Sequence, residues 1–157
     1  MINIYWEDLV PGTVRQLGTV TPNREEIIEF AQKFDPQPFH LSEEGGRASL
    51  FGGLCASGWH TCSMAMGLIV RNFLFEASSL GSPGLDNIRW LKPVQPGDTL
   101  RLEHEILESR PSKSKPDVGL IRTVWRMYNQ RDEQVLHMEG ASMFRRRHPA
   151  TDIHTPS

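Results

Sequence analysis

The chain has 157 residues, and its 17 Lys and Arg against 19 Asp and Glu leave a formal net charge of −2. This length fits one domain of ordinary size. The near-neutral charge excludes the basic field that typically holds nucleic acid. Hydrophobic residues make up 38% of the chain, with 13 glycines besides, which is typical of a globular domain with a sizeable core.

Residues 48–70 carry no Asp, Glu, Lys or Arg, and the segment is long enough to span a bilayer. Glycine, serine, threonine and histidine interrupt it, so a buried central helix entered through a glycine turn explains it better, and we expect no membrane partner. The acidic first ten residues do not resemble a signal peptide, which favours a cytoplasmic protein. Cys55 and Cys62 fall seven apart on that helix, about 10 Å between Cα atoms, too far for a disulfide.

The first half of the chain predicts a strand and two helices. Residues 13–20 form the strand, and Thr21 then caps a helix with Pro22 at its first position. That helix should end near residue 34, because Asp35 precedes a proline. Residues 35–51 are predicted as a loop with a short helical turn, and residues 55–77 as the buried central helix.

The second half predicts strands separated by turns. They comprise a short strand at 87–91, an alternating one from residue 99, and two more at 120–129 and 134–145. Consecutive antiparallel strands after one long helix indicate an α+β fold in which a curved sheet wraps around the helix. We assign residues 1–147 to this single domain and 148–157 to a polar tail. His104 lies on the apolar face of its strand, so we expect a buried histidine whose ring nitrogens are hydrogen-bonded.

The segment FDPQPFH, residues 34–40, places a carboxylate and an imidazole five residues apart, at Asp35 and His40. The prolines between them restrict the backbone and lower the entropy lost in holding the two groups together. Such a pair can transfer protons near neutral pH. Taken alone, the pattern is also typical of an exposed Asp and His that cap turns.

The segment LFGGLCASGWH, residues 50–60, leads a glycine-rich backbone into the start of the central helix. Free N–H groups at a helix N-terminus stabilise negative charge. A glycine at position 58 would let a substrate carbonyl approach the main chain closely. Gly58 is therefore a candidate donor to the oxyanion of a thioester enolate.

Together, FDPQPFH, FGGLCASGWH and the run IRWLKPVQPGD at residues 88–98 resemble the MaoC-like dehydratases, relatives of the (R)-specific enoyl-CoA hydratases with a hot-dog fold. The resemblance implies that Asp35 and His40 form the hydration dyad and that the Gly58 N–H binds the thioester oxygen. It also implies a homodimer that binds acyl-CoA or a related thioester. No metal or redox cofactor is implied, since coenzyme A is part of the substrate.

Some positions depart from that family or extend its site. Gln37 stands where many hydratases have Asn, and Met66 lies near a position where some carry a polar residue, which favours a different acyl pocket. We expect Gln37, Ser57 and Trp59 to contact the substrate. Candidates for the phosphates of coenzyme A are Lys92, Arg110 and residues 145–147, although basic side chains at strand ends are commonly only solvated.

The leading functional hypothesis is reversible hydration of an enoyl thioester. The alternatives are a hot-dog acyl-CoA thioesterase and a non-catalytic subunit that binds acyl thioesters. The Asp/His pair favours the lyase, because thioester hydrolysis requires no proton at Cα. A metal site is not expected, because no histidines have the i, i+4 spacing of a zincin and two cysteines seven apart make no zinc knuckle.

Overall fold

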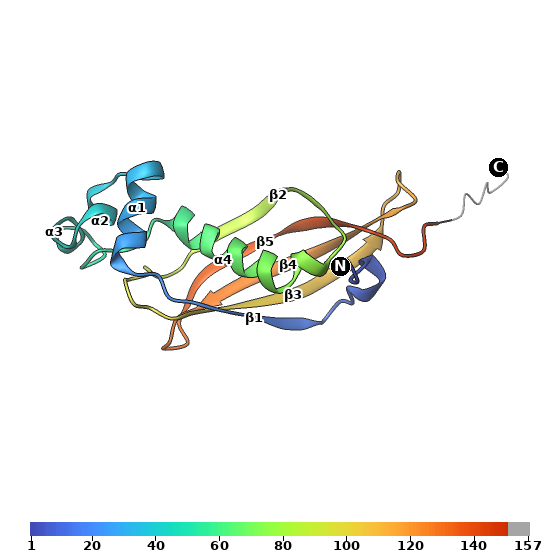
Figure 1. Cartoon of the computed structure of the whole chain (residues 1–157), viewed down its shortest axis with the longest axis horizontal. Coiled ribbons are helices and arrows are strands. Elements are labelled where there is room, and N and C mark those ends of the chain that lie inside the picture. The colour runs from blue at the N-terminus through green and yellow to red at the C-terminus, as the bar shows by residue number, and fades with distance from the viewer. Residues whose placement is uncertain (151–157) are drawn as a thin grey trace.

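The computed structural model describes residues 1–150. Within them, five strands form one antiparallel sheet in the order β1-β3-β4-β5-β2. The strands are β1 (Val14–Val20), β2 (Ser79–Trp90), β3 (Leu100–Pro111), β4 (Val118–Tyr128) and β5 (Gln134–Arg145). The helices are α1 (Arg24–Phe34), α2 (Pro38–Leu41), α3 (Glu43–Arg47) and α4 (Gly58–Asn72), with 3-10 turns η1 (Trp6–Asp8) and η2 (Leu74–Glu76). Figure 1 shows α4 lying along one face of the sheet, with α1, α2 and α3 gathered beyond one end, which confirms the predicted α+β architecture.

Helix α1 begins later than predicted. Asn23 is the N-cap, not Thr21: its side chain accepts a hydrogen bond from the Glu26 N–H, and Glu26 accepts one in return from the Asn23 N–H. This reciprocal capping box satisfies two backbone donors that a Thr21 cap would leave open. The helix ends at Phe34 as predicted, with Asp35 as its C-cap.

The central helix α4 is shorter than the predicted range 55–77. Ser57 caps its start, accepting from the Trp59 N–H, so Cys55 lies before the helix. At the other end, the Asn72 side-chain amide donates to the carbonyl of Leu68 and to that of Leu17 on β1. The Phe73 N–H still donates to the Ile69 carbonyl, and the 3-10 turn η2 follows directly, so the α-helix does not continue to residue 77.

The prediction that α4 is mostly buried is wrong for the single chain. Only one face is buried, made up of His60, Thr61, Ala65, Leu68 and Ile69. Met66 and Val70 lie outside this buried face and are exposed apolar residues. The helix therefore packs one stripe against the sheet and leaves a second apolar stripe uncovered.

Strand β2 is much longer than the predicted 87–91. It begins at Ser79 and pairs with β5 through several register shifts. Gly81 and Gly84 lie in this irregular part with φ of 98° and 149°. Glycine at these positions fits the irregular backbone, because only glycine adopts such angles without strain, and it hid the first part of the strand from the sequence pattern.

Strands β3, β4 and β5 fall close to their predicted ranges, and the alternation on β3 is confirmed, with Leu100, Leu102, His104 and Ile106 all buried. The expected hydrogen bonds of His104 are not formed. Neither ring nitrogen has a partner among residues 1–150, and the ring instead stacks on Trp125 at 4.1 Å between centroids. Phe73, which follows α4, packs at 5.0 Å from the same ring.

The basic run after β5 is tied to the N-terminal segment. The Arg147 side chain pairs with Asp8 at 2.7 Å, and its N–H donates to Glu7. Arg145 lies 3.7 Å from Asp117. These contacts hold the residues just before the predicted polar tail, of which residues 151–157 lie outside the described residues. Within residues 1–150, no helix combines the length and the apolar character needed to cross a bilayer.

Candidate active site

The predicted Asp/His pair lies where α1 ends and α2 begins. Asp35 leaves α1 with φ −156° and ψ 69°, and the Gln37 N–H donates to the Asp35 carbonyl. Pro38 opens α2, in which His40 follows. The two short helices α2 and α3 occupy much of the predicted loop 35–51, and proline at the first helical position explains the start of α2.

This turn brings the two side chains into contact. His40 Nε2 lies 3.3 Å from Asp35 Oδ2, and both side chains are largely buried, at 7% and 16% exposed. The His40 Nδ1 is 2.6 Å from the Cys55 carbonyl oxygen. Because a carbonyl only accepts, Nδ1 carries a hydrogen and donates it. In the neutral ring, Nε2 is therefore the nitrogen free to accept a proton, and it faces Asp35.

Two further side chains hold the Asp35 carboxylate. Gln37 Nε2 donates to Oδ1 at 2.7 Å, and the Ser57 hydroxyl donates to Oδ2 at 2.7 Å. Burial on its own would raise the pKa of Asp35, but these hydrogen bonds and the nearby His40 outweigh it and lower the pKa below the ordinary 3.8. Asp35 is therefore a carboxylate at neutral pH.

Helix α4 points its N-terminus at the same place. Gly58 is its first residue, and the first N–H groups of a helix have no acceptor within it. The expected reason for a glycine here needs correction. A Cβ at position 58 would lie 2.5 Å from Cε2 of Trp90, so the indole of Trp90, not an open approach path, occupies that space.

These groups line one pocket with a volume of about 470 Å³, whose walls include Asp35, Gln37, His40, Gly58 and Trp59. Ser57 is fully buried beneath it, held between Asp35 and the Trp59 N–H. Of the predicted site residues, Ser57 therefore positions the carboxylate, while Gln37 both lines the pocket and holds Asp35.

The structure adds three groups that the sequence did not single out. The Cys55 carbonyl orients His40, Trp90 packs against Gly58 and meets Trp59 edge-on at 5.2 Å, and Thr61 lines the pocket. No local pattern marked them, because a backbone carbonyl has no residue signature and Trp90 comes from a distant strand. Among the basic candidates, Lys92 lines the pocket, and its amine lies 3.1 Å from Glu133.

The five-stranded antiparallel sheet with α4 along one face (Figure 1) defines a hot-dog protein. A family profile described as the MaoC like domain matches residues 9–124. The chain belongs to the MaoC-like domain family. The crystal structure of the MaoC-like dehydratase from Rhodospirillum rubrum is similar with a TM-score of 0.87 and 38% identity, covering 93% of this chain and 99% of that one.

Two more relatives extend the comparison. An (R)-hydratase from Pseudomonas aeruginosa shares the fold, with a TM-score of 0.73 and 23% identity over 94% of this chain and 89% of its own. The uncharacterized protein YdeM of Bacillus subtilis is 25% identical over 140 residues, 89% of this chain and 98% of its own. The resemblance inferred from FDPQPFH and FGGLCASGWH and the hot-dog fold are thereby confirmed.

Proposed function

We propose that the protein catalyses the reversible hydration of a trans-2-enoyl thioester, with acyl-CoA as the substrate class. The observation that carries this proposal is the contact of 3.3 Å between His40 Nε2 and Asp35 Oδ2, in one pocket with the N-terminus of α4. The family membership supports a hydratase or dehydratase reaction.

In this mechanism one water lies against both members of the dyad, donating one hydrogen to Asp35 Oδ2 and one toward His40 Nε2. As the water oxygen bonds to Cβ of the enoyl group, the dyad takes one of its protons. The electrons of the double bond move toward the thioester, whose oxygen becomes enolate-like. The dyad then returns one proton to Cα, so that the product is a 3-hydroxyacyl thioester and the enzyme is regenerated.

The negative charge on the thioester oxygen would be stabilised by the Gly58 N–H, with support from the dipole of α4. The hydrogen bond from Nδ1 to the Cys55 carbonyl keeps Nε2 as the nitrogen that accepts and returns the proton. Ser57 and Gln37 keep the carboxylate ionised and oriented. Every step uses side chains and backbone of this chain, and the mechanism calls for no cofactor.

The test is loss of enoyl absorbance from trans-2-enoyl-CoAs, with free thiol assayed in parallel. Asp35→Asn and His40→Gln should each lower kcat at least about a hundredfold. Asp117→Asn is the matched control, because Asp117 lies in the loop before β4 and its side chain pairs with Arg145, not with a residue of the site. Thiol release would assign the protein to the thioesterases, and binding without turnover to the non-catalytic subunits. Wild-type rates in both dyad variants would refute the dyad.

We also propose that two copies pair through the edge strand β2. Its outer edge has no neighbouring strand within residues 1–150, and its side chains include the exposed Leu80 and Leu85. The exposed Met66 and Val70 of α4 add apolar surface in need of cover. Light scattering should give the mass of a dimer for the wild type and a lower mass for Leu80→Lys. A monomeric wild type would refute this pairing.

A further inference from the structure

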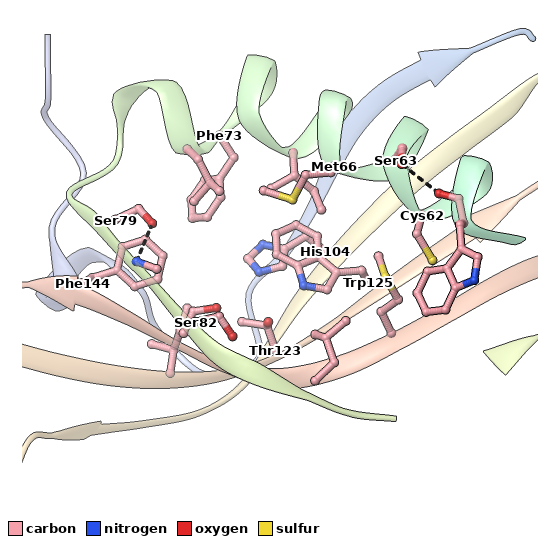
Figure 2. Close-up of a pocket in the computed structure, with 18 residues that line it drawn as sticks. Cys62, Ser63, Met66, Phe73, Ser79, Ser82, His104, Thr123, Trp125 and Phe144 are labelled. Carbon is pink, nitrogen blue, oxygen red and sulfur yellow. Dashed lines mark hydrogen bonds between the residues drawn. The ribbon is translucent and has the colours of Figure 1, made fainter. Parts of the chain in front are cut away.

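A second cavity of about 420 Å³ lies between α4, β2 and the inner face of the sheet. Figure 2 shows Met66 on the helix and Phe73 just past its end above the cavity, with His104 and Trp125 below them and Thr123 lower still. Trp59 lines both this cavity and the pocket of Asp35 and His40, so the two spaces adjoin at its indole. Under the proposed function, the cavity is where the acyl chain of the substrate would lie.

Most of the cavity wall is apolar, but two buried polar side chains on it have no hydrogen-bond partner within residues 1–150. His104 is 0% exposed and Thr123 is 1% exposed. Both ring nitrogens of His104 and the hydroxyl oxygen of Thr123 lack partners. A buried polar atom without a partner is unfavourable, so three such atoms on one cavity wall call for a ligand group that satisfies them.

The charge state of His104 restricts that group. Burial, with a smaller contribution from the charge of Arg15, lowers the pKa of His104 to about 3. At neutral pH the imidazole is uncharged, so one nitrogen donates a hydrogen bond and the other accepts one. The Thr123 hydroxyl can also do both. Neither the neutral imidazole nor the hydroxyl can neutralise a ligand carboxylate that has been removed from water. The guanidinium of Arg15 lies over the Phe73 ring, 5.2 Å from the centroid of that ring.

We propose that His104 and Thr123 select a substrate whose acyl chain carries an uncharged oxygen, such as a hydroxyl group, well along its length. An oxygen of this kind would pair with one ring nitrogen of His104 and with the Thr123 hydroxyl, whereas an unsubstituted chain would leave all three atoms unpaired. This inference rests on the proposed thioester site, because it assumes that the acyl chain enters past Trp59.

The sheet register locates the oxygen. Trp90, beside Gly58, pairs with Leu136 on β5, whereas Thr123 pairs with Gly140 four residues further along. Four residues advance about 13 Å along a strand, and the two strand spacings from β2 to β4 add about 10 Å sideways, which gives about 16 Å on a flat sheet. A hydrogen bond of about 2.8 Å at the far end leaves about 13 Å for the ligand itself. An extended chain advances about 1.2 Å per bond, so about eleven bonds separate the thioester oxygen from the bound oxygen, which places that oxygen on the tenth carbon of the acyl group.

The experiment compares binding of three saturated ten-carbon acyl-CoAs by calorimetry: decanoyl-CoA, 10-hydroxydecanoyl-CoA and the CoA monothioester of decanedioic acid. Saturated ligands report binding without turnover. The wild type should bind the hydroxylated ligand at least about tenfold more tightly than the other two. Thr123→Val and His104→Leu should each reduce that ratio toward one. Thr19→Val makes the same change at an exposed position of β1, and it should leave the ratio unaltered.

Each result decides between upholding and overturning the inference. A ratio near one in the wild type, a preference for the carboxylate, or a preference that survives both cavity variants would overturn it. Because the ratio is measured within each protein, a variant of reduced stability still reports selectivity, and Thr123→Val preserves the side-chain shape if His104→Leu fails to fold. Hydration of trans-2-decenoyl-CoA is scored separately: turnover without the preference refutes the inference alone, and preference without turnover refutes the proposed reaction alone.

Discussion

Replacing Gly58 by alanine tests how the start of α4 is held against strand β2. Gly58 is not among the glycines with positive φ, so its backbone accepts a side chain. The obstacle is packing, because the new Cβ would lie 2.5, 2.6 and 2.8 Å from Cε2, Nε1 and Cδ2 of Trp90. These distances fall about 1 Å short of ordinary contact, and such overpacking typically costs about 1–3 kcal/mol of stability.

Relief of this overlap must move either the Trp90 indole or the first turn of α4. A displacement of about 1 Å at a reacting group can lower the rate about a hundredfold. We therefore expect Gly58→Ala to reduce kcat for a trans-2-enoyl-CoA by about a hundredfold. In the Trp90→Leu background the three clashing atoms are gone, and the same substitution should reduce kcat by no more than about threefold, a coupling of about 2 kcal/mol.

The assay is a double-mutant cycle on kcat, with urea unfolding of all four proteins in parallel. Trp90 lines the pocket, so replacing it by leucine will change KM. The comparison is therefore restricted to the effect of Gly58→Ala on kcat within the wild-type background and within the Trp90→Leu background. Equal losses in both backgrounds would show that the glycine acts through something other than the indole. Full activity of Gly58→Ala would refute the close packing itself.

Three other outcomes follow from the pKa shifts. Ser57→Ala removes a hydrogen bond that lowers the pKa of Asp35, so the acid limb of the pH profile of kcat/KM should move to higher pH. An acid limb at the same pH in the variant would argue against the hydrogen bond between Ser57 and Asp35. Burial raises the pKa of the Cys55 thiol from 9.0 to about 11. In a Cys62→Ser protein, where Cys55 is the remaining thiol, alkylation at pH 8 should therefore be at least about a hundredfold slower than alkylation of an unfolded thiol. Equal rates would contradict this shift. His104 binds its proton more weakly in the folded state than at the ordinary 6.5. Lowering the pH from 7 to 5 should therefore reduce the free energy of unfolding of the wild type by about 2 kcal/mol more than that of His104→Leu. Urea unfolding at both pH values measures the two losses, and equal losses in the two proteins would refute this.

Much of the fold and site could be predicted from local sequence. The alternating residues of β3 and the turns around β4 and β5 mark strands, because sheet burial repeats every second residue. The pair Asp35 and His40 was predictable because both lie on one short stretch with fixed proline geometry. The glycine-rich approach also predicted a helix after it, although α4 begins at Gly58 and not at Cys55. Contacts within a few residues are controlled by the chain itself.

Only the tertiary structure decided what these residues meet. The Ser57 hydroxyl reaches Asp35 across 22 positions, and the Cys55 carbonyl fixes the tautomer of His40. The first part of β2, before the predicted residues 87–91, was hidden because its glycines suppress the alternating pattern, and it is pairing with β5 that makes that part a strand. His104 could be predicted as buried but not as unpartnered, since the sequence specifies which face a residue occupies, whereas hydrogen-bond partners depend on which distant strands and helices pack against that face.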